Sequence, residues 1–114
     1  MPIDSYAFGS MVVDGKAHTA DLILLPDGVR PDWWREKGHS LSVGDLQDVF
    51  AAGPDVLVVG TGAYGVMTVP DATRRALDEA GIETVVEKTG EAVERYNALL
   101  AEGRRVAGAF HLTC

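Results

Sequence analysis

The stretch Val58 to Gly65, V-V-G-T-G-A-Y-G, follows a run of apolar, β-branched residues and contains the pattern G-x-G-x-x-G. After a strand, such a loop can surround the pyrophosphate of a dinucleotide with backbone amides, and Glu87, 22 residues beyond Gly65, could bind a ribose hydroxyl. In dinucleotide sites, however, a helix begins within the glycine loop, whereas here Pro70 restricts the helix start to residues 68–70. The pattern therefore favours a tight turn over an NAD site.

Within this loop, Gly60 and Gly62 are predicted to shape the turn, and no cofactor is expected. Binding of a smaller anion by the amides of residues 61–63, beginning with Thr61, remains an alternative.

A second group of chemistry-bearing residues is the segment Trp33-Trp34-Arg35, followed by His39. Adjacent side chains of an extended segment point in opposite directions, so we expect one tryptophan to seal the core and the other to lie at the surface, with burial of both as the alternative. Tryptophan and arginine are enriched at binding hot spots, so an exposed tryptophan beside Arg35 would suit a protein interface. Arg35 could instead pair with Glu36 or another acid.

Further polar residues lie near the carboxyl terminus. Asn97 follows Tyr96 in a predicted helix, and its amide is expected to bind a loop backbone, with ligand binding as the alternative. His111 and Cys114 offer too few ligands for zinc, and a thiol at a chain end is poorly held for nucleophilic catalysis. No metal site and no catalytic residue are predicted, and no reaction can be assigned from residue spacing.

The elements that must position these residues follow from periodicity and turn signals. Residues 1–25 predict β-structure with a hairpin at Asp14-Gly15, residues 26–41 predict a loop, and residues 42–52 predict a helix that begins with a capping box. Beyond residue 54 the expected elements are strands at 55–59, 82–86 and 106–110, and helices at 70–80 and 89–102, the last capped by Thr89. This β-α-β-α-β order predicts parallel strands.

Composition excludes several classes of function. The 114 residues suit a single domain, residues 1–114, and no apolar run is long enough to span a membrane. The net charge of -7 disfavours nucleic-acid binding. A single cysteine, with no visible secretory signal or mitochondrial presequence, predicts a cytoplasmic protein.

Several motifs together resemble a known family. They are D-W-W-R-E at 32–36, G-H-S at 38–40, V-L-V-V-G-T-G at 56–62, T-G-E-A-V-E-R-Y-N-A-L at 89–99 and A-G-A-F-H-L-T-C at 107–114. Over nearly its whole length the chain resembles the small single-domain family that contains a mitochondrial complex I assembly factor three branch and a vertebrate adipogenesis-associated branch, with F-H-x-T-C pointing to the latter. The resemblance implies a three-layer α/β fold with a central mixed sheet and a smaller amino-terminal β layer. It implies roles in assembly and regulation through protein partners, and no established reaction.

Two hypotheses of function follow. The first is a protein-interaction or regulatory module, with a homodimer as one form of it, that uses the loop of Trp33, Trp34 and Arg35. The second is a binder of a small molecule or anion, or a weak enzyme, in which the loop from Gly60 to Gly62 supplies amides and Arg35 or His39 supplies charge. Both place function in loops held by a rigid scaffold.

Overall fold

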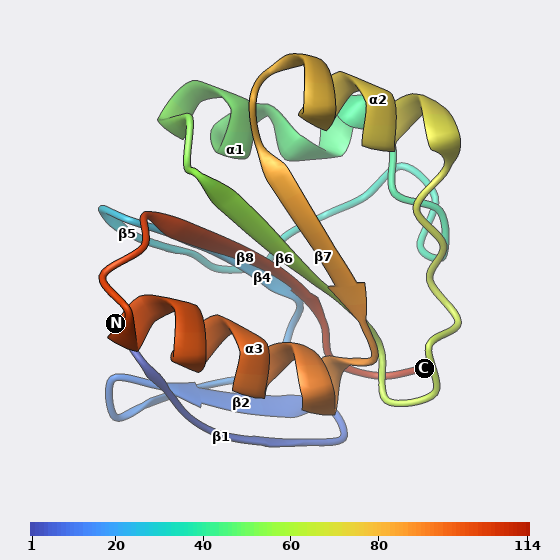
Figure 1. The fold of residues 1–114 in the computed structure, drawn as a ribbon. Coiled ribbons are helices and arrows are strands. Elements are labelled where there is room, and N and C mark those ends of the chain that lie inside the picture. Colours follow the sequence, from blue (N-terminus) through green and yellow to red (C-terminus); the bar gives the residue numbers. More distant parts are fainter.

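The structure, a computed structural model, describes residues 1–114 and contains two β-sheets with helices packed against them (Figure 1). The larger sheet has the strand order β5-β4-β8-β6-β7, with β4 at Leu22–Leu25, β5 at Gly28–Arg30, β6 at Val56–Thr61, β7 at Glu83–Glu87 and β8 at Val106–His111. The smaller sheet has the order β1-β2-β3, with β1 at Ile3–Ala7, β2 at Ser10–Val13 and β3 at Lys16–His18. The helical segments are the 3-10 helix η1 at Val43–Leu46 and the α-helices α1 at Gln47–Ala52, α2 at Asp71–Glu79 and α3 at Thr89–Ala101.

The predicted β-α-β-α-β unit is present. Strand β6 pairs in parallel with β7 on one side and with β8 on the other, so that Val58 lies opposite both Val85 and Gly108. Helix α2 connects β6 to β7, and α3 connects β7 to β8. Strand β4 is antiparallel to β8, and β5 is antiparallel to β4, so the central sheet is mixed, as the resemblance implied.

Side chains alternate between the two faces of the central sheet, and each face has its own core. In β6, Val56 and Val58 belong to a core shared with α3, whereas Leu57 and Val59 belong to a core shared with α1 and α2. A strand that is covered on both sides needs apolar residues at every position, which explains the continuous apolar run at 56–59.

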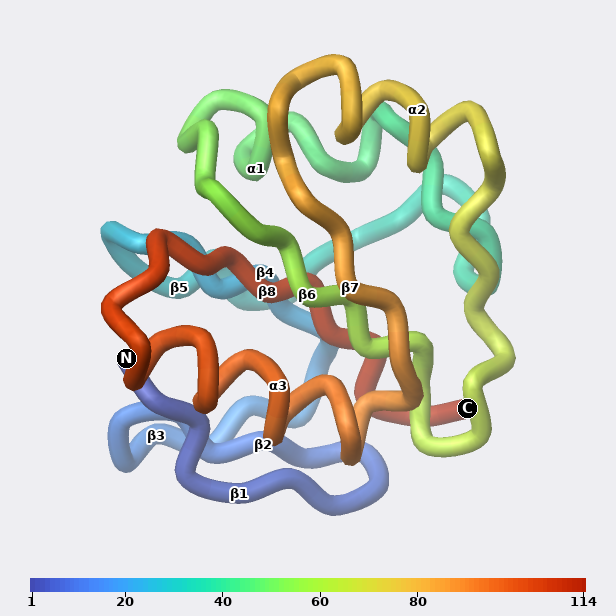
Figure 2. The backbone as a smooth tube through the Cα atoms, viewed as in Figure 1, coloured from blue at the N-terminus to red at the C-terminus, as the bar shows by residue number.

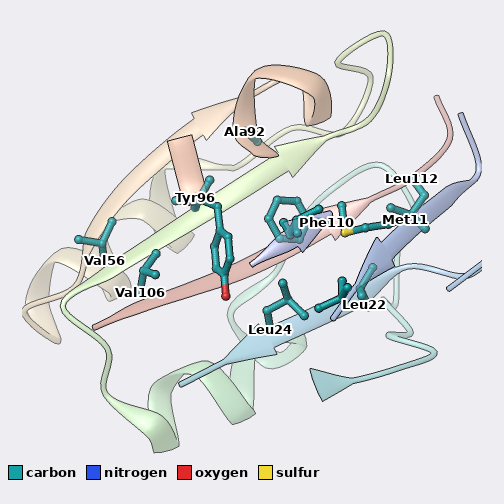
Figure 3. Close-up of a cluster of buried hydrophobic side chains, with 12 residues drawn as sticks. Met11, Leu22, Leu24, Val56, Ala92, Tyr96, Val106, Phe110 and Leu112 are labelled. Atoms are coloured by element: carbon teal, nitrogen blue, oxygen red, sulfur yellow. The ribbon is translucent and has the colours of Figure 1, made fainter. Parts of the chain in front are cut away.

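The core on the α3 side is built around two aromatic rings (Figure 3). Tyr96 meets Phe110 edge-on, with ring centroids 5.8 Å apart. A Cβ on Gly108 would lie 2.3 Å from the Phe110 ring and 3.2 Å from the Tyr96 ring. Gly108 therefore leaves the space that the two rings occupy.

The small amino-terminal sheet covers the same face as α3 and completes this core (Figures 1 and 2). Ile3, Met11 and Val13 are buried in it. The hairpin between β2 and β3 turns at Asp14 and Gly15, whose φ angles of 49° and 79° are those of the predicted two-residue turn. The predicted three-layer arrangement is confirmed: α1 and α2, the central sheet, and then α3 with the small sheet.

One prediction about local structure was wrong, and a second was confirmed except for the type of helix. Residues 26–41 were expected to form only a loop, but they include β5, which pairs with β4 at the edge of the central sheet. Three residues are too few to show an alternating pattern. The helix predicted at 42–52 is present with its capping box, in which the amide of Ser42 donates to Asp45, but its first turn is the 3-10 helix η1 and it becomes α-helical only at Gln47.

Thr89 also differs from its predicted role. It is the first residue of α3, and Lys88 occupies the cap position. The buried Thr89 hydroxyl accepts a hydrogen bond from the amide of Gly62 at 2.8 Å and donates one to the carbonyl of His111 at 2.6 Å. Thr89 therefore joins the ends of β6 and β8 to the start of α3. None of the helices combines the length and apolar character needed to cross a membrane.

Candidate functional site

The carboxyl ends of the parallel strands meet at one end of the central sheet, the position at which open α/β sheets bind ligands. Thr61 and His111, the last residues of β6 and β8, are paired in register. Because β4 is antiparallel to β8, with Leu22 opposite Phe110, Asp21 is brought to this end as well. Asp21 and His111 lie 90 residues apart in sequence and within hydrogen-bonding distance in space.

Arg35 reaches this end of the sheet from the tryptophan segment and is buried, with 8% of its surface exposed. Its Nη2 lies 2.8 Å from Asp21 Oδ2 and 3.1 Å from His111 Nδ1. Its Nε and Nη2 also donate to the carbonyl of Gly38, and its guanidinium lies 4.6 Å from the centre of the Trp33 ring system. The acid that pairs with Arg35 is thus Asp21. The guanidinium group of Arg35, which was predicted to lie at an exposed interface, is buried inside the protein.

Asp21 is the centre of this buried charge cluster of Asp21, Arg35 and His111. Its Oδ2 contacts Arg35 Nη2 and His111 Nδ1, each at 2.8 Å, and its Oδ1 accepts from the amide of Leu112 at 2.8 Å. Burial alone would raise the pKa of Asp21, but hydrogen bonds from His111, the Leu112 amide and Arg35 outweigh burial and hold the pKa below its ordinary value of 3.8. Asp21 is therefore a carboxylate that neutralises Arg35.

The sequence did not predict that Asp21 belongs to this site, nor that Arg35 contacts His111. The available signals were an aspartate directly before the buried strand β4 and a histidine at the end of β8. Antiparallel pairing of these two strands was needed to bring them together, and the pattern alone did not specify it.

The two tryptophans divide as predicted, one inward and one outward. Trp33 is half-buried against the α1 and α2 core, and its indole nitrogen donates to the carbonyl of Asp45 at 2.9 Å. Trp34 is 76% exposed. It borders a surface pocket of about 300 Å³ lined by ten residues, Ile23, Arg30, Pro31, Asp32, Trp33, Trp34, Gly44, Asp45, Gln47 and Asp48.

The glycine loop after β6 is a tight turn whose amides bind the protein's own chain. The amide of Gly62 donates to Thr89, that of Ala63 to the carbonyl of Thr113, and those of Tyr64 and Val66 to the carbonyl of Cys114. Figure 2 shows the carboxyl-terminal segment, in red, beside this loop. The amide of Gly65 donates to the carbonyl of Gly62, so all five amides of residues 62–66 have partners within the protein.

The two candidate glycines are required by close packing. A Cβ on Gly60 would lie 2.8 Å from both Phe110 Cδ1 and Thr89 Oγ1. Gly62, with φ of 105°, would place a Cβ 2.3 Å from the carbonyl carbon of Cys114. Thr61 is buried, and its hydroxyl donates to the carbonyl of Glu87 at the end of β7.

Of the remaining candidates, His39 lies at this end of the sheet and Asn97 is occupied elsewhere. His39 is exposed, and its ring lies edge-on to that of His111, with centroids 5.4 Å apart. Asn97 lies on α3, where its side-chain amide exchanges two hydrogen bonds with the backbone of Ile3 at 2.9 and 2.8 Å. The backbone-binding interpretation of Asn97 therefore describes the contact, although its partner is strand β1.

The side chains that could bind a metal ion are not gathered at one place. No group of three or more His, Cys, Asp or Glu side chains is placed to hold a metal ion. Cys114 is exposed and forms no disulfide.

The chain belongs to a family described as "Protein of unknown function (DUF498/DUF598)", which residues 3–111 match. A curated relative is an uncharacterized protein of Rhodobacter capsulatus, 29% identical over 109 residues that make up 96% of this chain and 82% of the relative. This membership confirms the resemblance to a family of small α/β proteins.

Solved structures share the fold over almost the whole chain. The NMR structure of the Rpa2829 protein of Rhodopseudomonas palustris is 37% identical, with a TM-score of 0.79 over 95% of this chain and 80% of that one. The crystal structure of a protein described as an outer membrane protein from Bartonella henselae is 29% identical, with a TM-score of 0.85 over 99% of this chain and 95% of that one.

Proposed function

We propose that this protein is a cytosolic interaction or regulatory module that binds a protein partner through the surface around Trp34. The observation that carries the proposal is the exposure of this large aromatic side chain, of which 76% faces solvent. Tryptophan is the residue type most enriched at the centres of protein interfaces.

Hydrogen bonds and an ion pair hold the residues on both sides of Trp34. On one side, the Trp33 backbone amide donates to the carbonyl of Asp21 at 2.7 Å and its indole donates to Asp45. On the other side, Arg35 is fixed by Asp21 and Gly38. Little backbone freedom remains to be lost on binding, and such preorganisation favours affinity.

The charge around Trp34 selects the partner. Asp32, Asp45 and Asp48 line the adjacent pocket, and its one cationic lining residue, Arg30, is paired with Asp27 at 3.6 Å. An indole face beside carboxylates favours a cationic side chain. The chain as a whole carries a net charge of -7, which also favours a basic partner. The expected partner segment therefore presents lysine or arginine.

Family resemblance supports the same class of function. The complex I assembly factor three branch and the adipogenesis-associated branch, which this chain resembles, imply action through protein partners. A single exposed cysteine suits the reducing cytosol. The amides of residues 62–66, which the small-molecule hypothesis needs, are already bonded within the protein.

Trp34→Ala tests the proposal. Immobilised wild-type protein should retain a partner, or elute as a self-associated species, and Trp34→Ala should lose this while its unfolding midpoint stays unchanged. Tyr64→Ala is the matched control, because Tyr64 is a 70% exposed aromatic in a different loop and should retain binding. Equal binding by the wild type and Trp34→Ala would contradict the proposal, and so would equal loss in both variants.

The charge of the partner is tested separately. Asp32→Asn and Asp48→Asn should weaken the retained complex, and raised salt should weaken the wild-type complex more than either variant's. Salt-independent binding in all three would point to an apolar partner.

A further inference from the structure

Strand β7 forms one edge of the central sheet, and its outer side has no partner strand. The strand order is β5-β4-β8-β6-β7, so β7 pairs only with β6 (Figure 1). The strand at the other edge, β5, has three residues, whereas β7 has five. An edge strand of this length offers backbone donors and acceptors at the spacing of another strand, which is the partner that suits it chemically.

The backbone groups that face outward from β7 belong to Thr84 and Val86. The amide of Glu83 donates to the carbonyl of Asp55, on the side of β6. Alternate residues of a parallel strand bond to the same neighbouring strand, so Val85 also faces β6, and Thr84 and Val86 face away from it. Neither of these two residues forms a backbone hydrogen bond with a turn or loop. The N–H and C=O groups of both residues are therefore open to an added strand.

Helix α2 borders the same edge and places one unpaired charge of each sign beside it. Arg75 and Asp78 line a surface pocket of about 330 Å³ together with Thr84. Every other arginine of the chain donates a hydrogen bond or forms an ion pair, whereas the side chains of Arg75 and Asp78 have no partner. A free cation and a free anion on one surface are self-complementary, because a two-fold axis can bring each of them to the other's counterpart in a second copy.

One register between two copies satisfies every outward group of β7. In an antiparallel pair about a two-fold axis, Val85 can lie opposite its own copy, and Thr84 then lies opposite Val86 of the partner subunit. Opposite residues of this kind exchange both of their backbone hydrogen bonds, and the Val85 side chains meet where the two strands are closest. All outward N–H and C=O groups of both strands are bonded in this register.

Neighbouring registers lose these bonds. A shift of two residues brings in Ile82, whose amide already donates to Leu77, or Lys88, whose carbonyl already accepts from the amide of Ala92. A shift of one residue sets outward groups against groups that face β6. The free backbone groups therefore specify a single register.

The charges at the ends of β7 are compatible with this register. It places Glu83 opposite Glu87 of the partner subunit, and like charges in this position repel. However, Glu83 pairs with Arg104 at 3.7 Å and Glu87 pairs with Arg95 at 3.3 Å within the same chain. Each carboxylate therefore meets the other with its own counter-ion in place.

We propose that two copies of this chain associate through their β7 edges, so that the two central sheets join into one, and that Arg75 of each copy pairs with Asp78 of the partner subunit. The two-fold axis sets the two α2 helices side by side in opposite directions. The Trp34 surface lies beside β4 and β5, at the other edge of the sheet, and stays free in both copies. The dimer therefore presents the Trp34 surface twice, which strengthens binding to a partner that carries two matching segments.

Amide hydrogen exchange of the wild-type protein, followed by NMR at several protein concentrations, tests the edge directly. Dilution to the monomer should speed the exchange of the Thr84 and Val86 amides by about tenfold or more, whereas the Val85 amide, bonded to β6, should not respond. Sedimentation equilibrium over the same range should show the mass falling from twice 12.1 kDa to 12.1 kDa. Exchange at Thr84 and Val86 that is independent of concentration, or a monomer even at about 1 mM, would overturn the proposal.

A proline variant locates the pairing. Thr84→Pro removes an amide that the monomer does not use, and proline is tolerated at such a position of an edge strand. The dimer loses one hydrogen bond in each copy, so its dissociation constant should rise by about a hundredfold or more. Thr84→Val keeps the amide and is the matched control, which should dimerise as the wild type does. Equal dimerisation of the two variants would overturn the proposal, and if Thr84→Pro does not fold, hydrogen exchange of the wild type decides alone.

Charge exchange tests the contact between the α2 helices. Arg75→Asp and Asp78→Arg each bring like charges together, so each variant alone should dimerise about tenfold more weakly. An equimolar mixture of the two restores both pairs of opposite charge and should regain the wild-type dissociation constant. A mixture that dimerises no better than either variant would overturn the proposal.

Trp34→Ala separates this dimer from the interaction surface proposed above. It should leave the dimer unchanged while it loses the partner, and Thr84→Val should lose neither. Self-association that Trp34→Ala abolishes and Thr84→Pro preserves would arise from the Trp34 surface, and it would overturn the dimer through β7.

Discussion

The glycine loop of residues 60–66 and the tryptophan segment of residues 32–39 lie at the same end of the central sheet, and they use their polar groups in opposite ways. The glycine loop resembles a ligand-binding motif in sequence, yet each of its amides from Gly62 to Val66 bonds to the protein itself. The tryptophan segment matches no ligand-binding motif, yet it exposes Trp34 and leaves Arg35 Nη1 unpaired.

This difference shows that donor groups identify a site only when they remain unpaired in the fold. The glycines after β6 allow the carboxyl-terminal segment to approach closely, and that segment takes the amides. We therefore propose that binding at this end of the sheet involves the tryptophan segment. Substitutions in the two regions should separate stability from binding.

Gly62→Val is expected to have the largest effect. Its Cβ would fall 2.3 Å from the carbonyl carbon of Cys114 and 2.8 Å from His111 Cδ2, at a φ of 105° that L-residues avoid. Neither a backbone carbonyl nor a buried ring can move aside easily, so we expect destabilisation by about 4 kcal/mol or more, or failure to fold. Urea denaturation measures the loss.

Gly65→Ala is the control for the glycine loop. Its φ of 71° is also positive, but its Cβ would approach closely only the flexible Lys88 side chain, at 3.2 Å, and would make an ordinary contact with Thr61 Oγ1 at 3.6 Å. A cost of about 1–2 kcal/mol is expected from the backbone conformation. If Gly62→Val costs no more than this, the close approach of the carboxyl-terminal segment is wrong.

Asp21→Asn should have the next largest effect, because it removes the charge that neutralises Arg35. Breaking one partner of a buried ion pair costs about 3–5 kcal/mol, since the remaining charge is left uncompensated. Asp21 and Arg35 side chains are 17% and 5% exposed, so we expect a value near the lower limit, about 3 kcal/mol, by thermal or urea unfolding.

Glu87→Gln provides the comparison for Asp21→Asn. Glu87 pairs with Arg95 at 3.3 Å, but the two side chains are 34% and 53% exposed. Such exposed pairs contribute about 1 kcal/mol or less. Equal losses in the two variants would mean that the cluster of Asp21, Arg35 and His111 is open to solvent.

Trp33→Ala and Trp34→Ala should differ in stability although the residues are adjacent. Trp33→Ala removes the packing of the ring, its hydrogen bond to Asp45 and its contact with Arg35, so we expect the free energy of unfolding to fall by about 2–3 kcal/mol. Because Trp34 is 76% exposed, Trp34→Ala should lower the free energy of unfolding by about 0.5 kcal/mol or less. A large loss in Trp34→Ala would show that its role is structural and would remove the basis for the interaction surface.

The fold was predictable to a large extent because its signals are local. Apolar runs at 56–59 and 106–110, the turn at Asp14-Gly15 and the stop at Gly53-Pro54 each report on a few neighbouring residues. The short strand β5 was not predicted, because it is a strand through its pairing with β4 and not through a sequence pattern of its own.

The candidate site was predictable only in part because its contacts are distant in sequence. Arg35 and His111 are 76 residues apart, and Asp21 and His111 are 90 apart. The inward and outward tryptophans followed from alternation along an extended segment. The burial of Arg35 did not, because its acid partner, Asp21, lies directly before the antiparallel strand β4, whose pairing with β8 no local pattern revealed.

The acid dependence of stability, compared between the wild type and Asp21→Asn, reports on the charge of Asp21. Burial would raise the pKa of Asp21, but its hydrogen bonds from His111, Leu112 and Arg35 hold the pKa below 3.8 in the folded protein. A group whose pKa is lowered on folding stabilises the protein fully above its unfolded pKa, and this stabilisation is lost as the pH falls through the folded pKa. The difference in unfolding free energy between the wild type and Asp21→Asn should therefore be constant from pH 7 to about pH 5 and shrink below pH 4. A difference that stays constant down to pH 2 would show that Asp21 gains no stabilisation from its charge, and Arg35 would then need another counter-ion.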